Sequence, residues 1–367
     1  MTDRTKLRIL LIQQEFTTWR RARRWSYSVQ LGLEEGLNAN GIEFFTITTP
    51  WLCQARNICK DKHFDQVWLE IVHTNLDDDW LQWISELAPI RIGLIGESLE
   101  YTPEEYTFLG HLRGRRQEVE NRFKYITHVV ACDEKDAERI NGYGLIPAMW
   151  WPQAVPERFI NPDITSINYH YAVFGGALYG ERANWLRHPE LKDIIFYLQL
   201  PEGLVTYALF DTLHFTSSVV LNSGFPANDT LLCYYLNFLR SIRRKCFIKW
   251  LEGLQSGCAV VNLPHPVKTY AGRVVEGIAA GRPIISWEIP DRPQNKNLFE
   301  DGKEILLYPK NNPSALADCI KRILSDPDLG KRLVTNAQHK LKHFHTAEKR
   351  VSQILDWAID EKMPVYF

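Results

Sequence analysis

The stretch "AGRVVEGIAAGRPIISWE", residues 271–288, carries the clearest local signal in the chain. Small apolar residues from Arg273 to Ala280 predict one or two helical turns, Gly281 suits the position after a helix C-terminus, and Pro283 stops the helix from continuing. A β-branched strand follows at once. The stretch therefore predicts a helix–strand unit of a parallel α/β sheet.

Arg273 and Glu276 stand three residues apart in this predicted helix. That spacing places both side chains on one face, close to the helix N-terminus. Backbone N–H groups and the helix dipole favour anions at such an end. The alternative is an Arg–Glu pair on a helix surface, which contributes only a few tenths of a kcal/mol.

Composition limits the class of protein. The 367 residues suit two domains, and an aromatic content of 12% with twelve Trp supplies enough apolar surface for folded cores. The net charge of -1 gives no overall attraction to nucleic acid or to an anionic membrane, so nucleic acid is not an expected partner. Seven Cys without a CxxC pair disfavour zinc and disulfides and favour a cytoplasmic protein. No apolar stretch approaches the length of a membrane span, which leaves peripheral contact with a membrane open.

Short apolar strands alternate with amphipathic segments along residues 1–150, which is typical of a doubly wound parallel sheet. The predicted strands are 7–12, 42–47, 66–72, 91–96 and 127–133. A passage with four prolines, residues 144–163, predicts a linker or a crossing strand. We assign the linker to residues 151–168.

The alternation resumes in residues 169–345, where six further strands are predicted: 169–176, 192–200, 217–222, 258–263, 282–287 and 304–309. Two helical stretches, 312–326 and 327–360, close the chain, and residues 346–367 are expected to pack back toward the first domain. Two Rossmann-like domains in tandem place ligands at the carboxyl ends of their strands, facing a cleft between the domains.

Three motifs occur in order in the second half. They are "GRVVEGIAAGRPIIS", then "LFEDGKEILLYPKNNPSALADCIKRILSDPDLGKRL", then His345-Thr346 with Arg350 four residues after the threonine. Together they resemble the C-terminal domain of retaining GT-B glycosyltransferases of group 1, with most similarity to the CgeB-like branch, in which an Arg precedes the Glu by three residues. The resemblance covers about residues 170–355, and over the first half it is only architectural.

The resemblance implies roles for several residues. Glu276 would hydrogen-bond the ribose hydroxyls of a nucleoside-diphosphate sugar, since a carboxylate accepts from a diol. Arg273 and the helix N-terminus would face the diphosphate. In the larger family a second Glu stands eight residues upstream, where this chain has Lys268. A lysine cannot accept from sugar hydroxyls but can neutralise a diphosphate, so the donor sugar and the stereochemical course stay open.

The segment "FGGALYGERANWL", residues 174–186, predicts a strand end followed by a helix start. Gly175 and Gly176 would allow backbone to approach a phosphate, and Arg182 resembles the basic residue that binds diphosphate after the first strand of this domain. The alternative is an ordinary strand–helix turn.

Candidates for the acceptor side lie in the first half. Glu97 and His73 each follow a predicted strand, and either could act as a base or orient an acceptor hydroxyl; a surface or capping role is the alternative. Arg20 and Arg24 belong to "TTWRRARRWSYS", residues 17–28, where arginines and aromatic residues together suit a phosphate-bearing or sugar acceptor. A solvated helix face is the alternative.

No metal is expected. The acidic run Asp77–Asp79 precedes an amphipathic segment, so we interpret it as a helix cap and not as a metal motif. Basic residues and helix N-termini stabilise the leaving diphosphate in GT-B enzymes. The resemblance thus implies a metal-independent, hexosyltransferase-like enzyme without cofactor, acting on a glycan, lipid, protein or small-molecule acceptor. A GT-B nucleotide-sugar epimerase and a non-catalytic sugar-nucleotide-binding partner subunit remain as alternatives.

Overall fold

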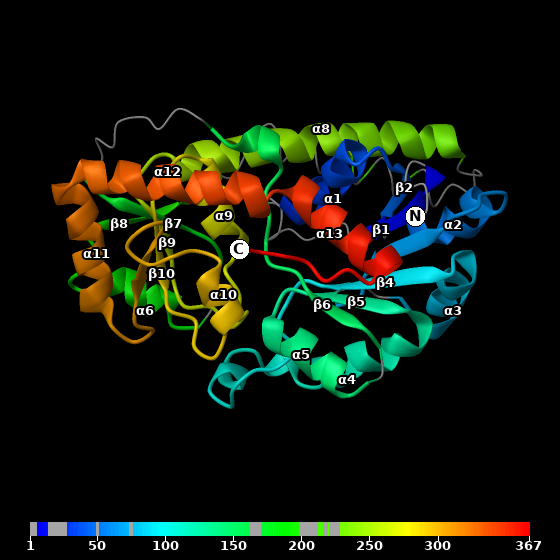
Figure 1. Ribbon diagram of the computed structural model, residues 1–367, viewed down its shortest axis with the longest axis horizontal. Helices are drawn as coiled ribbons and strands as arrows, with labels where there is room; N and C mark the ends of the chain where they lie inside the picture. Colours follow the sequence, from blue (N-terminus) through cyan, green and yellow to red (C-terminus); the bar gives the residue numbers. More distant parts are fainter. Residues whose placement is uncertain are drawn as a thin grey trace.

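Two parallel β-sheets covered by helices make up the described part of the computed structural model (Figure 1). The structure describes residues 6–13, 28–48, 51–72, 76–144, 146–161, 170–178, 180–198, 212–213, 215, 219 and 228–367. The α/β fold with two Rossmann-like domains is confirmed. The predicted strand 217–222 lies almost entirely outside the described residues.

The first sheet has the strand order β2-β1-β3-β4-β5-β6. Its strands are β1 (Arg8–Gln13), β2 (Glu43–Thr48), β3 (Gln66–Glu70), β4 (Ile90–Ile95), β5 (His128–Ala131) and β6 (Ala148–Trp150). All neighbours pair in parallel, as expected for strands that read as apolar runs. Strand β6 lies inside the proline-containing passage that the sequence assigned to a linker or crossing strand.

Side chains of successive β1 residues point to opposite faces of this sheet. Ile9 and Leu11 pack with α1 (Ser28–Ala39) and α13 (Ala347–Asp360). Leu10 and Ile12 belong to the larger buried cluster on the other face. That face is covered by α2 (Leu52–Cys59), α3 (Asp78–Leu87), α4 (Arg115–Glu120) and α5 (Glu134–Gly142). Asp77 caps α3, since its carboxylate accepts from the backbone N–H of Trp80 at 3.0 Å.

The second sheet has the order β11-β10-β9-β7-β8. Its strands are β7 (Ala172–Gly175), β8 (Ile195–Leu198), β9 (Val260–Asn262), β10 (Ile284–Trp287) and β11 (Leu306–Tyr308). The helices of this half are α6 (Arg182–Arg187), α8 (Asp229–Leu254), α9 (Gly272–Ala279), α10 (Pro293–Asn297), α11 (Pro313–Ser325) and α12 (Pro327–Phe344). Short 3₁₀ helices are η5 (Glu105–Thr107), η6 (Gly110–Leu112), η7 (Asn121–Tyr125) and η8 (Glu157–Phe159).

A break at His345 and Thr346 divides the chain's last helical stretch into α12 and α13. Thr346 caps α13 by accepting from the backbone N–H of Lys349 at 3.3 Å. Arg350 is buried and donates to the carbonyl of Pro152 at 3.1 Å. This motif therefore directs α13 from the second domain back onto the first.

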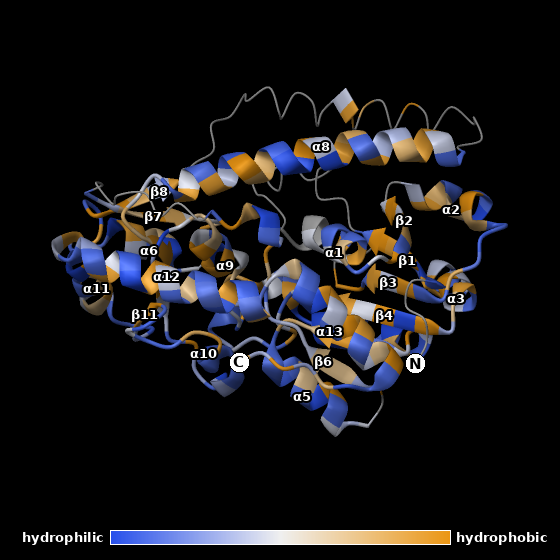
Figure 2. Ribbon diagram, turned by 45° about the horizontal axis from the view of Figure 1, so that its top comes forward, coloured by the Kyte–Doolittle hydropathy of each residue, from blue (hydrophilic) through white to orange (hydrophobic). Residues whose placement is uncertain are grey.

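Helix α8 extends along both domains at the top of Figure 1. Polar and apolar residues alternate along it in Figure 2, and its buried side includes Leu232, Leu239, Phe247 and Trp250. Near the middle of α8 Arg240 pairs with Glu34 of α1, whereas the C-terminal residues of α8 pack into the core of the second domain. The helical spacing of apolar residues within 239–250 predicts a helix with a charged outer face, but no local pattern predicts that this helix joins the two domains.

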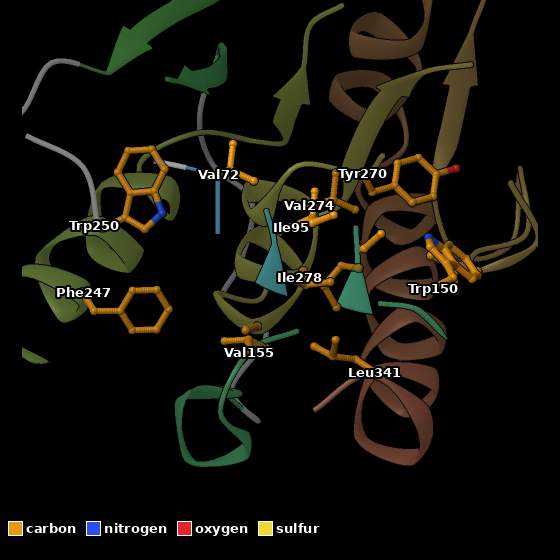
Figure 3. Packing of buried hydrophobic residues seen from close by; sticks show 14 of the residues in the cluster. Val72, Ile95, Trp150, Val155, Phe247, Trp250, Tyr270, Val274, Ile278 and Leu341 are labelled. Atoms are coloured by element: carbon orange, nitrogen blue, oxygen red, sulfur yellow. The ribbon is translucent and has the colours of Figure 1, made fainter. Parts of the chain in front are cut away.

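One buried cluster runs through both halves of the molecule. Val72 and Ile95 of the first half and Val274 and Ile278 of the second are members of it (Figure 3). The domains consequently share apolar core as well as polar contacts.

Helices α1 and α13 approach closely at Gly36. A Cβ placed there would lie 2.4 Å from Cγ2 of Val351 and 2.8 Å from the carbonyl oxygen of Ala347. Gly36→Ala should therefore lower the midpoint of urea unfolding, with a loss of about 1–3 kcal/mol from overpacking that exceeds the gain in helix propensity. Gly142→Ala in α5 is the matched control, since a Cβ there meets nothing within 4 Å. An unchanged midpoint for Gly36→Ala would show that α13 can shift away from α1 without cost.

Candidate functional site

The residues predicted to bind a nucleotide sugar gather at the carboxyl ends of β7 and β9. Helix α9 carries Arg273 and Glu276, and Gly281 follows it with a φ of 75°, as the sequence predicted. Gly175 and Gly176 lie at the end of β7.

Glu276 is buried, with 4% of its surface exposed. Its Oε2 accepts a hydrogen bond of 2.8 Å from the indole Nε1–H of Trp250 on α8. The carboxylate folds back over the first turn of its own helix, since a Cβ on Gly272 would lie 3.1 Å from Oε1. The carboxylate thus stands at the N-terminus of α9, where the helix dipole favours negative charge.

Arg273 lies beside the end of β7. Its Nη1 donates to Oδ1 of Asn262 at 3.0 Å, and its guanidinium carbon is 5.0 Å from the ring centroid of Phe174. Burial lowers the pKa of Arg273 to about 10, so the side chain is still charged at neutral pH. Gly176 has a φ of 147°, and a Cβ there would lie 2.3 Å from Nη2 of Arg273. Only glycine fits at this approach.

Arg182 begins α6, as predicted, and is 1% exposed. It donates to the carbonyl oxygens of Ala177 at 2.8 Å, Pro264 at 2.9 Å and Leu263 at 3.3 Å. Its guanidinium carbon lies 5.3 Å from the ring of Phe174. Arg182 therefore joins the loop after β7 to the loop after β9, and two guanidinium groups flank one aromatic ring.

His265 lies in the loop after β9 and accepts a hydrogen bond at Nδ1 from the backbone N–H of Val267 at 2.9 Å. Burial, followed by the positive charges of Arg182 and Arg273, holds the pKa of His265 well below its usual range. The imidazole is neutral at physiological pH. The same charges make this edge of the sheet favourable for an anion.

Lys268 lies at the contact between the domains. Its Nζ pairs with Oε2 of Glu105 at 2.9 Å and donates to the carbonyl of Glu100 at 2.8 Å. Its backbone N–H donates to Oγ of Ser98 at 2.8 Å. The predicted contact with a diphosphate stays a prediction, because in this structure the ammonium group is held by the first domain.

A second polar contact joins the domains nearby. Arg292 forms a bidentate pair with Asp133, with Nε–Oδ1 and Nη2–Oδ2 distances of 2.6 and 3.0 Å. Glu134 accepts from the backbone N–H of Asn295 at 2.6 Å, at the start of α10. These contacts bring the carboxyl ends of the two sheets together.

The acceptor-side candidates are only partly described. Glu97 is half-buried after β4, directly before Ser98, which contacts Lys268. Glu97 thus lies at the domain interface, and its charge contributes, after burial, to raising the pKa of Tyr101 above its usual range. His73, Arg20 and Arg24 lie outside the described residues.

Several residues of the site were not predicted. Trp250 comes from a helix that ends 17 residues before α9 begins, so no local pattern links it to Glu276. Asn262 orients Arg273 and donates to Oγ of Ser286 at 2.9 Å. A polar residue ending an apolar strand, in "CAVVNL", was the available signal for Asn262.

The described residues contain no group of three or more His, Cys, Asp or Glu side chains placed to hold a metal ion. Within the same residues, no helix has both the length and the apolar character needed to cross a membrane.

Comparison with known proteins agrees with this arrangement. Residues 249–356, which include α9, match the family model described as "Glycosyl transferase-like". The match therefore covers the C-terminal part of the second domain and most of α13. A search of curated protein sequences found no match.

Solved structures of the GT-B fold superpose over nearly the whole chain. Sucrose-phosphate synthase from Thermosynechococcus elongatus is 11% identical, with a TM-score of 0.61 over 97% of this chain and 99% of that one. An alpha-glucosyltransferase in complex with UDP and DNA is 12% identical, with a TM-score of 0.59 over 96% and 99%. Anabaena HepE in complex with UDP-glucose is 12% identical, with a TM-score of 0.55 over 95% and 99%. At these identities the likeness establishes the GT-B fold.

The contact between Lys268 and Glu105 generates a test. If Lys268 mainly joins the domains, Lys268→Met and Glu105→Gln should lower the urea midpoint by similar amounts and be non-additive, with a coupling of about 0.5–3 kcal/mol. Lys249→Met, which removes an exposed lysine paired with Glu252, should leave the midpoint unchanged. Loss of nucleotide affinity in Lys268→Met but not in Glu105→Gln would instead support the diphosphate role.

Proposed function

We propose that the protein transfers a sugar from a nucleoside-diphosphate sugar to an acceptor that is still to be identified. The observation that carries this proposal is the placement of Arg273 and Glu276 at the N-terminus of α9, within the glycosyl transferase-like domain. One acceptor-only group and one cation at a helix N-terminus match the two polar parts of a nucleotide, a ribose diol and a diphosphate.

In this proposal Glu276 accepts hydrogen bonds from the ribose hydroxyls. Arg273 and the first N–H groups of α9 stabilise the diphosphate as it leaves, and Ala271 before the helix has no side chain that could cap them. Arg182 holds the loops after β7 and β9 together, beside Gly175 and Gly176, and its predicted contact with the diphosphate stays a prediction. Structures of similar fold that hold UDP or UDP-glucose support a nucleotide sugar as the donor.

On the acceptor side, Glu97 or His73 would orient or deprotonate the acceptor hydroxyl, and Arg20 and Arg24 would contact the acceptor. Membership of the CgeB-like branch, transfer of a hexose and retention of configuration are further proposals based on the sequence motifs. None of the seven cysteines is joined in a disulfide, which is compatible with the reducing cytoplasm that the sequence predicts.

Glu276→Gln tests the ribose contact. The amide keeps the volume and an oxygen that can accept from Trp250, but it loses the charge, so the affinity for the preferred nucleoside diphosphate should fall at least about tenfold. Calorimetric titration of the purified protein measures it. Glu252→Gln, an exposed carboxylate of the same domain, is the control. Equal affinity in wild type and Glu276→Gln would remove Glu276 from the site.

Metal independence is tested by measuring sugar release from the donor in EDTA and in magnesium. Turnover should be the same in both, because Arg273, Lys268 and Arg182, together with the N-terminus of α9, would supply the positive charge at the leaving group. Complete loss in EDTA with recovery in magnesium would contradict the metal-free mechanism.

The same assay separates the alternative functions. Donor binding without any release or transfer would favour the non-catalytic partner subunit, and conversion of the sugar without an acceptor would favour the epimerase.

A further inference from the structure

Helix α8 reaches the candidate donor site through a single large side chain. Trp250 lies near the C-terminal end of α8, is 4% exposed, and donates its indole N–H to Oε2 of Glu276. Figure 3 shows Trp250 beside Phe247 on this helix, with its nitrogen labelled by colour. An indole nitrogen can only donate, so this hydrogen bond fixes the edge of the Trp250 ring that faces the carboxylate.

The close packing of Trp250 depends on Gly175 at the end of β7. A Cβ on Gly175 would lie 2.4 Å from Cη2 of the indole. The indole is therefore confined between the strand end and α9. Burying a carboxylate is unfavourable unless it is hydrogen-bonded, and the indole N–H supplies such a bond while it limits the rotamers of Glu276.

The middle and the N-terminal end of α8 are attached to the first domain. Arg240 binds Glu34 through two hydrogen bonds of 2.8 and 2.9 Å, and Arg243 donates to Gln13 at 3.2 Å. Asp229 at the start of α8 pairs with Lys62. One continuous helix thus connects anchors on the first domain to the carboxylate in the second.

We propose that Trp250 is a positioning residue for the ribose-binding carboxylate: it holds Glu276 in the orientation that accepts from the sugar hydroxyls, and it ties that orientation to the placement of α8 on the first domain. This inference rests on the proposed function. It gives α8 a role in donor recognition, and the sequence around α9 contains no motif that would predict this role.

The test compares two ligands that differ only in the ribose hydroxyls. The first is whichever of UDP, ADP, GDP and CDP wild type binds most tightly, and the second is its 2′,3′-dideoxy counterpart. In Trp250→Phe the affinity for the ribonucleotide should fall about tenfold, while that for the dideoxy counterpart should change by no more than about twofold. Equal losses for both ligands would show a general packing role and overturn the inference.

Trp287→Phe is the matched control. Trp287 is a buried tryptophan of the same domain, and among the described residues its indole nitrogen has no hydrogen-bond partner. It should show no preferential loss for the ribonucleotide. The double variant Trp250→Phe with Glu276→Ala should bind no more weakly than Glu276→Ala alone, because Trp250 then has no carboxylate to orient. Additive losses would contradict the inference.

Gly175→Ala provides a second route if Trp250→Phe does not fold, because its methyl group displaces the indole without removing it. The same hydroxyl-dependent loss is expected, and its absence would overturn the inference. A failure of the proposed function can be distinguished from a failure of the positioning role of Trp250. If wild type binds none of the four nucleotides, the proposed function fails; if wild type binds and only Glu276→Gln weakens binding, the role of Trp250 alone fails.

Discussion

The buried ion pair between Arg292 and Asp133 holds the carboxyl ends of the two sheets against each other. Asp133 lies two residues after β5 and caps α5, and Arg292 directly precedes α10. Two charges removed from water must satisfy each other, and loss of either would leave an uncompensated charge at a cost of about 3–5 kcal/mol. The contact continues into the second domain, where Asn295 of α10 accepts from the backbone N–H of Tyr270, two residues before α9. The position of α9 relative to the first domain follows from this chain of contacts.

Two helices add to this constraint from the opposite side of the molecule. Helix α13 packs on α1, and α8 is anchored to Glu34 of α1 and donates to Glu276 of α9. These helix contacts are combined with a buried apolar cluster that includes residues of both halves. The domains are therefore joined by a shared apolar core as well as by polar contacts at their interface. Helix α8 thus contacts the first domain through Arg240 and Arg243 and the donor side of the second domain through Trp250.

Much of the fold could be predicted from the sequence. Apolar runs such as residues 7–12 and 91–96 identified strands of parallel sheets, and Gly281 with Pro283 identified the end of α9. The passage around Pro147 and Pro152 left a linker and a crossing strand open as alternatives for β6, because a strand of three residues between prolines has no usable period. Within the site, Arg182, Arg273 and Glu276 came from local motifs, whereas Trp250 and Asn262 could not, because their partners are distant in sequence.

The sequence by itself determined the elements and their polarity: which segments are strands, where α9 begins and ends, and which charged residues stand near its N-terminus. Only the tertiary structure decided which hydrogen-bond and ion-pair partners those charged residues have. Arg182 is occupied by three backbone carbonyls, Lys268 pairs with Glu105 across the interface, and Glu276 is oriented by Trp250. The physical reason is that periodicity and capping act over a few residues, while a buried charge takes whichever partner the packing of distant elements brings within hydrogen-bond distance.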